Sequence, residues 1–334
     1  MTILSLPFGP TRTCMTPAPT LSPAEDRVID AARDRKVRVV HLTHNDLDAV
    51  GADAVHRRRY GDVFTVFSSV GKFPAFFERL AALPGRGDLL SITDLGYQDA
   101  AVPALEAARL NGWRVEWRDH HRWNDEECRA VRERADLLRV DTTRCGCGIA
   151  AVDLLPDDPV AREIASVVCD YDLWLHQDPR SAVLGQVLQR PRNRYHVRDL
   201  LVKGRFTDEQ VEAEYADIRK EMSGNIEHSI THVHLAGKRY RTAFAPLYGY
   251  PSETAAAIRE RLGTEIEVIV SPSGRFSIRS VPPISHLVAR RFGGGGHPHA
   301  AGGDFAFSFV DRLGFALFKR SRRYRDLVAA ADAL

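Results

Sequence analysis

The sequence has no apolar run that approaches the ~18–20 residues of a membrane-spanning helix, so we expect no membrane span. It also carries little net charge, because 46 Lys and Arg oppose 44 Asp and Glu, for a formal charge of +2. That balance excludes a polybasic coat for nucleic acid. Hydrophobic residues make up 44% of the 334 residues, which excludes a disordered chain. At roughly 150 residues per domain, the length indicates about two domains.

Cysteine is also scarce. The five cysteines, at positions 14, 128, 145, 147 and 169, are too few for a disulfide framework. Cys145 and Cys147 lie in a CGCG segment, and no second pair is present to complete a zinc site. We therefore expect reduced thiols in a cytoplasmic protein, and we expect CGCG to allow close helix packing.

The first 23 residues are rich in Pro, Thr and Ser and show no periodicity. They lack the basic and apolar regions of a signal peptide, so we interpret 1–23 as a disordered leader, within which Met15 is an alternative start. Ser22 followed by Pro23 predicts the beginning of a helix, with Ser as its N-cap.

Strand and helix patterns then alternate four times with short loops. The expected strands are 36–43, 63–68, 88–93 and 113–117, and the expected helices are 49–59, 73–83 and 101–111. This alternation is typical of a parallel sheet built from βαβ units. Further helices are expected at 125–138, 147–155 and 159–169.

A change in the sequence pattern near residues 225–232 indicates a domain boundary. Residues 207–230 have a long polar helix pattern, and strand-like runs with two helices, 252–262 and 284–292, follow it. We therefore expect an α/β fold with a parallel-sheet domain at 24–205, a helical connector at 206–230 and a smaller mixed α/β domain at 231–334.

Carboxylates and histidines follow several of the expected strands. In an open parallel sheet, ligands bind beyond the carboxyl ends of the strands, so these side chains should meet at one edge. They are His44, Asp46 and Asp48 after the first strand, Asp94 after the third, Asp119, His120 and His121 after the fourth, and Asp170 and Asp172 after a later helix.

A single Asp at a strand end is an ordinary helix N-cap, but so many acids in one crevice would repel each other at neutral pH. A bound cation relieves that repulsion. Mixed Asp and His ligands without thiolates suit Mn²⁺ or Mg²⁺ better than structural zinc. Two ions about 3.5–4 Å apart would favour in-line attack of water on phosphorus.

These residues form recognisable motifs. DHH at 119–121, HNDLDAVG at 44–51, ITD at 92–94 and DYD at 170–172 resemble the four motifs of the DHH phosphoesterase superfamily. FGGGGHPHAAGG at 292–303 resembles the glycine-rich motif of the associated DHHA1 domain. The HxDxD form of the HNDLDAVG segment, and the YDxW form of the DYD segment, are most similar to the oligoribonuclease B, or nanoRNase, branch.

The resemblance implies a manganese-dependent phosphodiesterase or phosphatase with its active site in the cleft between two domains. It implies metal ligands at His44, Asp46, Asp48, Asp94, His120 and either Asp172 or Asp170, with Asp94 between two ions. The more widespread form of the motif has its His where this chain has Leu42. Asp119 would orient the His pair, and His121 would act on the scissile phosphate as a hydrogen-bond donor or general acid.

The glycine run 293–296 cannot pack a core, but its backbone N–H groups can approach a phosphate closely. The alternative is a tight turn. We therefore take Gly294, Gly295, Gly296 and His297 as candidates for substrate binding. Arg279 matches a family position that faces the cleft, and its guanidinium suits phosphate.

The function that we expect is hydrolysis of short oligonucleotides to mononucleotides, an exonuclease activity of the oligoribonuclease type. The alternatives are a 3′-phosphoadenosine 5′-phosphate phosphatase, a cyclic-dinucleotide phosphodiesterase, or a nucleotide-binding sensor without catalysis. Partners would be short RNA, DNA or nucleotides, and a homodimer is left open. A local excess of ten Lys and Arg over four Asp and Glu in residues 271–334 suits a short anionic substrate.

Overall fold

The computed structural model describes residues 20–334, so the leader expected at 1–23 lies almost wholly outside the described residues. The chain divides into a first unit that ends at Val211 and a second unit, Glu212–Leu334. Within residues 20–334, no helix is long and apolar enough to cross a membrane.

The first described helix begins as the sequence predicts. Ser22 caps it, with Pro23 at its first position, and Glu25 closes a capping box with Ser22. The helices of the first unit are α1 Pro23–Arg33, α2 Leu47–Tyr60, α3 Phe73–Ala81, α4 Val102–Leu110, α5 Asp125–Arg132, α6 Gly146–Leu154, α7 Pro159–Asp172, α8 Pro179–Val187 and α9 Arg194–Val202, with short 3₁₀ turns η1 Asp99–Ala101 and η2 Pro191–Asn193. Helix α10, Glu209–Ile230, contains the point of division.

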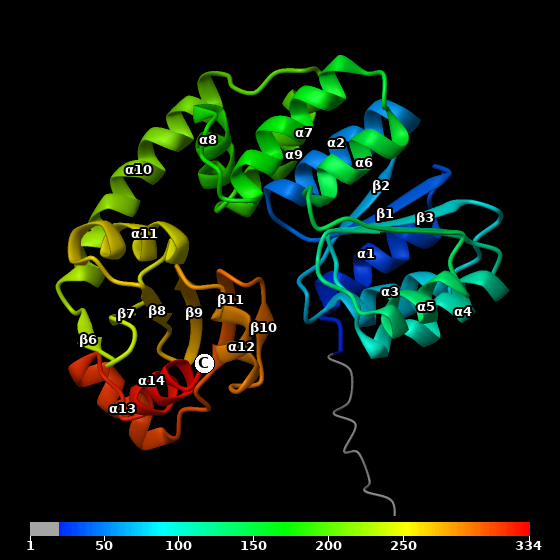
Figure 1. The fold of residues 1–334 in the computed structure, drawn as a ribbon. Coiled ribbons are helices and arrows are strands. Elements are labelled where there is room, and N and C mark those ends of the chain that lie inside the picture. The colour runs from blue at the N-terminus through cyan, green and yellow to red at the C-terminus, as the bar shows by residue number, and fades with distance from the viewer. Residues whose placement is uncertain (1–19) are drawn as a thin grey trace, which may run out of the picture. The chain divides into compact units, whose positions relative to one another are not determined.

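The first unit is built on a five-stranded sheet whose strands all run parallel. The strands are β1 Val39–Thr43, β2 Phe64–Phe67, β3 Leu89–Thr93, β4 Arg114–Asp119 and β5 Leu137–Val140. Their order is β2-β1-β3-β4-β5. Helices α1, α3, α4 and α5 cover one face, and α2, α6, α7 and α9 lie beyond the other (Figure 1).

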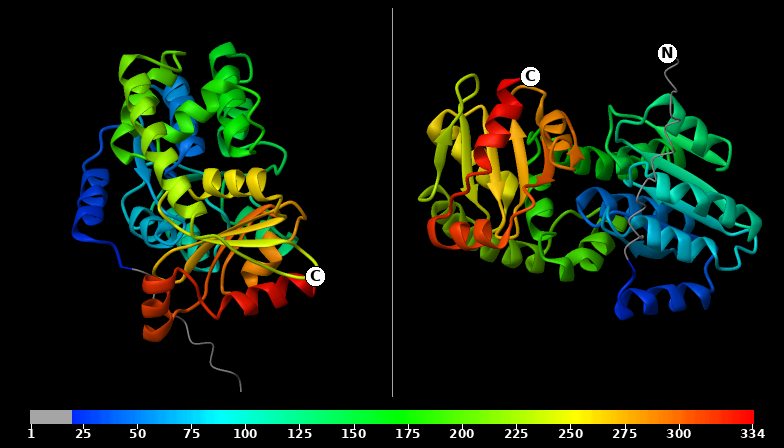
Figure 2. Two further views of the ribbon diagram at one scale, coloured as in Figure 1. Left: turned by 90° about the vertical axis from the view of Figure 1, so that its left-hand side faces the viewer. Right: turned by 90° about the horizontal axis from the view of Figure 1, so that it is seen from below.

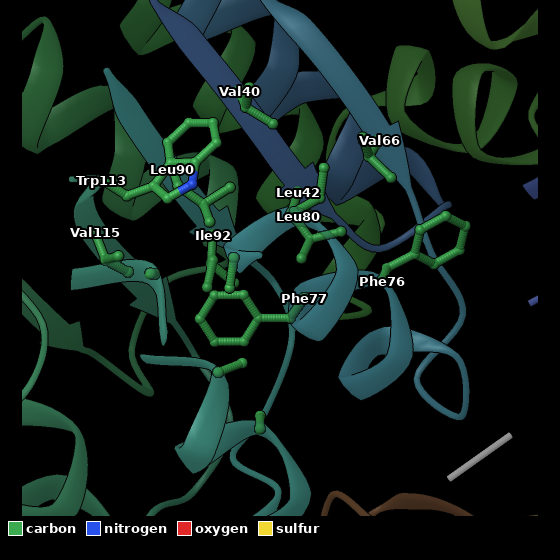
Figure 3. Close-up of a cluster of buried hydrophobic side chains, with 14 of the residues drawn as sticks. Val40, Leu42, Val66, Phe76, Phe77, Leu80, Leu90, Ile92, Trp113 and Val115 are labelled. Carbon is green, nitrogen blue, oxygen red and sulfur yellow. The ribbon is translucent and has the colours of Figure 1, made fainter. Parts of the chain in front are cut away.

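The central strands β1 and β3 are buried on both faces, as their apolar sequences require. Side chains of β1 and β3 pack against α3 and the rings of Trp113 and Phe77 (Figure 3). The expected helix 125–138 is wrong at its end, because residues 137–140 form β5. Its LLRV sequence pairs with β4, so pairing outweighs the helical periodicity read from the sequence.

The second unit is built on a mixed six-stranded sheet. The strands are β6 His234–Ala236, β7 Thr242–Pro246, β8 Ile266–Val270, β9 Arg275–Ser280, β10 Gly295–Gly296 and β11 Ala300–Asp304, and the helices are α11 Pro251–Leu262, α12 Ser285–Arg290, α13 Phe309–Phe318 and α14 Tyr324–Asp332. The order is β10-β11-β9-β8-β7-β6, with β7 and β8 parallel and the other pairs antiparallel.

Alternate residues along the strands of this sheet point to opposite faces, and each face packs in its own hydrophobic core. Phe244 and Val268 pack with α12 and α14, whereas Ala243 and Ile269 pack with α11. Figure 2 shows α11 and α14 on opposite faces of the sheet. The expected α/β class with a parallel sheet and a second, smaller mixed sheet is therefore confirmed.

Candidate metal centre

The sheet order brings three of the motif segments to one edge. β1, β3 and β4 are neighbours and parallel, so the residues after Thr43, Thr93 and Asp119 leave the sheet at the same end. His44 follows β1, Asp46 is the N-cap of α2, and Asp94 follows β3. The backbone at Asp94 has φ +53, a left-handed conformation that non-glycine residues rarely adopt and that is common at functional sites.

His44 and Asp46 form one side of the centre. Their Nδ1 and Oδ2 atoms are 2.8 Å apart, and the same His44 nitrogen lies 3.6 Å from Oδ2 of Asp94. Burial opposes ionisation of Asp46, but the hydrogen bond and charge of His44 lower its pKa to about 2. The pKa of His44 is raised, because its contact with Asp46 outweighs the effect of burial. This contact therefore favours an ionised Asp46 beside a protonated His44.

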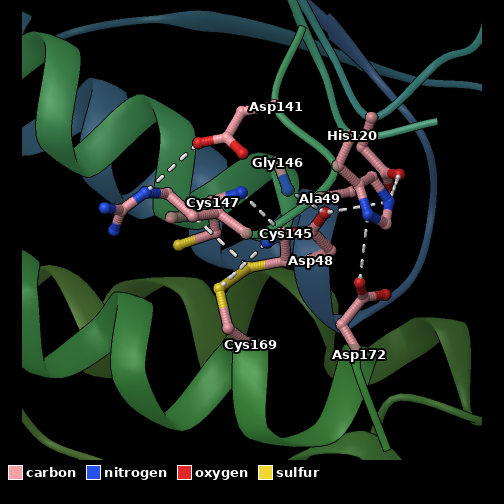
Figure 4. Close-up of a disulfide and its surroundings, with 12 residues drawn as sticks. Asp48, Ala49, His120, Asp141, Cys145, Gly146, Cys147, Cys169 and Asp172 are labelled. Atoms are coloured by element: carbon pink, nitrogen blue, oxygen red, sulfur yellow. Dashed lines mark hydrogen bonds and ion pairs between the residues drawn. A yellow bond between two sulfur atoms is a disulfide. The ribbon is translucent and has the colours of Figure 1, made fainter. Parts of the chain in front are cut away.

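Asp48 is anchored from a distant part of the chain. Its two oxygens accept hydrogen bonds from the backbone N–H groups of Gly146 and Cys147, each at 2.6 Å, at the N-terminus of α6 (Figure 4). A side chain at Gly146 would place its Cβ 2.9 Å from the Asp48 carboxylate, so glycine is required there. Burial and the charge of Asp46 nevertheless raise the pKa of Asp48 to about 7.

Asp94, His120 and Asp172 form the buried side of the centre. Nε2 of His120 lies 3.2 Å from Oδ1 of Asp94, and Nδ1 of His120 lies 3.6 Å from Oδ2 of Asp172 (Figure 4). Oδ2 of Asp94 and Oδ2 of Asp172 are buried and accept no hydrogen bond from any described residue. Burial and the surrounding carboxylates raise the pKa values of Asp94 and Asp172 well above the usual range.

Asp119 holds His121 in place. Its Oδ1 is 2.8 Å from Nδ1 of His121, and its Oδ2 accepts the indole N–H of Trp123 at 2.6 Å. Burial opposes ionisation of Asp119, but His121 and Trp123 lower its pKa. Nδ1 of His121 is thereby committed to Asp119, which leaves Nε2 as the ring nitrogen for other contacts. No sequence pattern indicates this role of Trp123.

Within the first unit, three groups of ligand atoms lie close enough together to hold a metal ion. Each group has its atoms within 4.8 Å of one another, and Asp94 belongs to all three: His44 with Asp46 and Asp94, Asp48 with Asp94 and His120, and Asp94 with Asp119 and His121. The ligands are carboxylate and imidazole only, which suits Mn²⁺ or Mg²⁺. Cations would neutralise the buried carboxylates and give the two unpaired oxygens a partner, so these residues fit metal ions.

Asp170 lies outside this cluster although it is two residues from Asp172. Its oxygens accept hydrogen bonds from the N–H groups of Gln177 at 2.8 Å and Asp178 at 3.2 Å and from the Ser181 hydroxyl at 2.5 Å. Burial opposes ionisation, but these donors lower the pKa of Asp170. Asp170 thus shapes the turn between α7 and α8.

A buried polar network lies behind the strand ends. Nε2 of His41 is 2.8 Å from the Thr93 hydroxyl, and Nδ1 of His41 is 3.3 Å from Asp53. Thr93 also contacts Thr43 at 2.8 Å, so the last residues of β1 and β3 are tied together next to His44 and Asp94. No sequence pattern indicates these partners of His41.

The expectation of reduced thiols is wrong for two cysteines. Cys145 and Cys169 form a disulfide that joins the N-cap of α6 to α7 (Figure 4). Cys128 and Cys147 are free. The number and spacing of the cysteines exclude a disulfide framework and a paired zinc site, but they do not reveal a single bridge between two helices. The glycines do allow close packing, since a Cβ on Gly148 would lie 2.8 Å from the Cys169 sulfur.

The candidates for substrate binding belong to the second unit. Gly295 and Gly296 form β10, and the His297 N–H donates to the Ala300 carbonyl at 2.7 Å in the turn that leads to β11. A Cβ at Gly294 would lie 1.8 Å from the Gly302 carbonyl oxygen, so the close approach of β11 requires glycine there. Arg279 lies on β9 and donates to the Ser252 hydroxyl at 2.7 Å.

Compared by sequence, the chain matches no protein-family model and no curated protein. Solved structures do resemble it. RecJ from Thermus thermophilus, in complex with Mn²⁺, aligns with a TM-score of 0.53 at 16% identity. The chain has the fold seen in RecJ. The alignment covers 94% of this chain but only 56% of RecJ, so the chain spans little more than half of that protein's length.

Two more solved structures align over nearly their full length. An exonuclease RecJ bound to manganese has a TM-score of 0.49, 17% identity and coverage of 92% of this chain and 97% of its own. The pGpG-specific phosphodiesterase PggH from Vibrio has a TM-score of 0.47, 14% identity and coverage of 86% and 99%.

Proposed function

We propose that this protein is a metal-dependent phosphoesterase of the DHH superfamily that hydrolyses short oligonucleotides to mononucleotides. The observation that carries the proposal is the position of Asp94, which belongs to all three groups of candidate ligands in the first unit. A shared carboxylate is the arrangement required to hold two cations close together. The Mn²⁺ present in the structure of RecJ from Thermus thermophilus supports the same chemistry.

In this proposal the ligands are His44, Asp46, Asp48, Asp94, His120 and Asp172. When bound, Mn²⁺ ions supply Lewis-acid stabilisation of the charge that develops on a phosphoryl group. The hydrogen bonds that Asp48 accepts from α6 fix the position of its carboxylate. Asp170 is not proposed as a ligand, because its oxygens are already occupied by three donors.

His121 is proposed to act on the substrate. Asp119 occupies Nδ1 of His121 and raises the pKa of the imidazole against the effect of burial. A protonated His121 has an N–H at Nε2, so it can donate a hydrogen bond or a proton to a phosphate oxygen. Asp119 is the positioning residue for this step, and Trp123 fixes Asp119 in turn.

The second unit is proposed to bind the substrate phosphates through Gly294, Gly295, Gly296, His297 and Arg279. Gly295 is the member with open space around its Cα, since an added Cβ would meet no atom within 4 Å. A short substrate is favoured because the nearly neutral chain offers a small electrostatic footprint. A cytoplasmic location is part of the same proposal.

The test is hydrolysis of 5′- and 3′-labelled oligonucleotides of two to five residues, with Mn²⁺, by the full chain. Cyclic dinucleotides and 3′-phosphoadenosine 5′-phosphate, tested in parallel, separate the alternative substrates. Asp94→Asn should lower turnover by at least about 100-fold, since it removes the carboxylate common to the three groups. The product pattern over time gives the direction of cleavage.

Asp217→Asn is the matched control, because Asp217 is an exposed acid on α10 outside the cluster. Its turnover should equal that of the unchanged protein. Tight oligonucleotide binding without any Mn²⁺-dependent hydrolysis would instead support the nucleotide-binding sensor. Full activity of the Asp94→Asn variant would show that the centre is elsewhere.

A further inference from the structure

The second unit contains a cavity that the proposed hydrolysis does not use. It has a volume of about 710 Å³ and lies between β6, the turn that follows it, and the segment that joins α13 to α14. Small-molecule sites usually have ~300–1,000 Å³. β6 is one edge strand of the six-stranded sheet, and the glycine strand β10 is the other edge. At about 4.8 Å per strand, roughly 24 Å separate the two edges.

The lining of the cavity is strongly basic. Lys238, Arg320 and Arg325 line it, and none of them has an acidic partner within 4 Å in the part of the chain that the structure describes. Asp332 is the acid in the lining, and it already accepts hydrogen bonds from the backbone N–H groups of Lys238 and Arg239, each at 3.3 Å. Three cations without an acidic partner therefore face the cavity, against the single negative charge of Asp332.

The pKa of the neighbouring His234 is affected by this charge. His234 also lines the cavity, and burial together with the charge of Arg320 lowers its pKa. A neutral imidazole at neutral pH can still donate or accept a hydrogen bond. The field in the cavity is positive, so an anionic group is the ligand that it would attract.

Tyr324 provides an independent observation. It lines the cavity, its residue is 3% exposed, and its hydroxyl is buried without a hydrogen-bond partner among the described residues. Its ring stacks on Phe244, with 4.1 Å between the ring centroids, so the core fixes its position. An unpaired buried hydroxyl is costly, and a ligand that pairs with it would remove the cost.

The cavity also has an apolar wall. Phe318, Val328 and Ala329 line it beside the basic residues, and Phe318 is 71% exposed. Aromatic rings and guanidinium groups both stack on nucleobases. The volume of the cavity is large for a simple inorganic anion. The combination of cations with an exposed aromatic ring suits an anion that carries a planar ring system.

We propose that this cavity is a second binding site, separate from the carboxylate–histidine centre, for a nucleoside monophosphate. Lys238, Arg320 and Arg325 would contact the phosphate, and Phe318 would contact the base. The inference goes beyond the proposed hydrolysis and does not depend on it, because it concerns binding without metal or turnover.

The experiment is a calorimetric titration of the full chain in EDTA with AMP, adenosine and inorganic phosphate as separate probes. We expect AMP to bind more tightly than either part alone. The double variant Arg320→Ala/Arg325→Ala should weaken AMP binding by at least about tenfold, since charge-assisted hydrogen bonds are lost. Arg312→Ala is the matched control, because Arg312 is an exposed cation on α13 outside the lining.

Tyr324→Phe keeps the ring and removes only the unpaired hydroxyl. It should weaken AMP binding several-fold while leaving the thermal midpoint of the free protein unchanged or higher. A structural role alone would lower the midpoint and leave binding unchanged.

Several results would overturn the proposal. They are absence of AMP binding at millimolar concentration, unchanged binding in the double arginine variant, and inorganic phosphate binding as tightly as AMP. Loss of binding in Arg279→Ala or Asp94→Asn, with the double arginine variant unaffected, would place AMP at the sites of the proposed hydrolysis instead. Because EDTA prevents metal-dependent turnover, a failed hydrolysis assay leaves this test intact.

Discussion

Asp170 and Asp172 belong to one short motif but have opposite surroundings. Three donors surround the oxygens of Asp170, whereas Oδ2 of Asp172 is buried without a donor and lies near His120. The sequence could limit the choice to these two residues, because both stand in DYD. It could not decide between them, since the turn from α7 to α8 that encloses Asp170 has no signature in the motif.

The two carboxylates should therefore respond differently to the same substitution. Asp170→Asn places an amide donor opposite the Gln177, Asp178 and Ser181 donors, so we expect a loss of ~1–3 kcal/mol in the free energy of unfolding. Asp172→Asn removes a poorly compensated buried carboxylate, so the metal-free protein should be unchanged or more stable. Mn²⁺ binding should be weakened only in the second variant.

Urea unfolding measures the first effect, and calorimetric titration with Mn²⁺ measures the second. The two variants control for each other, since each changes one oxygen of the same residue type. Equal losses of stability in the two variants would contradict the assignment of ligand and turn residue. Loss of Mn²⁺ binding in Asp170→Asn alone would reverse it.

At the scale of elements, the sequence predicts the positions of the strands and of the residues at their ends well, because hydrophobic periodicity determines both. The strands that carry Thr43, Thr93 and Asp119 were expected within a few residues of their positions, and their parallel order follows from βαβ connections. The support from α6 was not expected. Gly146 is 98 residues from Asp48 in sequence, and no local pattern links a glycine in CGCG to a carboxylate in α2.

The disulfide is the element-scale feature with the clearest consequence. Cys145 caps α6 and is bonded to Cys169 on α7, and the next two N–H groups of α6 hold Asp48. Closing a loop with a sequence separation of 24 should stabilise the fold by about 3 kcal/mol. Reduction should remove that amount and weaken Mn²⁺ binding, because α6 would then fix Asp48 less firmly.

Urea unfolding with and without dithiothreitol is the measurement. Cys169→Ser should show the lower stability in both conditions, and Cys128→Ser, at a free cysteine, should behave like the unchanged protein. If thiol titration of the untreated folded protein finds Cys145 and Cys169 reactive, and dithiothreitol has no effect on stability, the bridge does not form in solution.

For the whole molecule, the small net charge hides an uneven distribution. Residues 271–334 carry ten Lys and Arg against four Asp and Glu, which leaves an acidic excess in the remainder. This asymmetry is visible in the sequence, where we interpret it as suited to a short anionic substrate. The structure adds a basic cavity beside β6, which holds Lys238, Arg320 and Arg325. Composition could not reveal it, because the cavity joins residues about 80 positions apart only after the sheet has folded.

The stability of the whole protein should depend jointly on pH and metal. Burial and neighbouring carboxylates raise the pKa of Asp48 to about 7 and raise the pKa values of Asp94 and Asp172 as well. A group whose pKa is higher in the folded state binds protons more tightly when folded. Its stabilising contribution is therefore complete below the unfolded value of about 3.9 and is lost as the pH rises through the folded pKa.

Without metal, these three carboxylates should make the protein less stable as the pH rises toward about 8. Metal ligands must be deprotonated, so Mn²⁺ binding should become stronger over the same interval. We expect Mn²⁺ to raise the thermal unfolding midpoint more at about pH 8 than at about pH 6, with the metal-free protein showing the reverse trend. Thermal unfolding at matched ionic strength, with Mn²⁺ or EDTA, measures both curves. The double variant Asp94→Asn/Asp172→Asn should lose most of both effects, since it removes two of the three carboxyl groups whose pKa values are raised. A Mn²⁺-induced rise that is equal at the two pH values, or larger at the lower one, would mean that these carboxylates are not the groups from which the metal displaces protons.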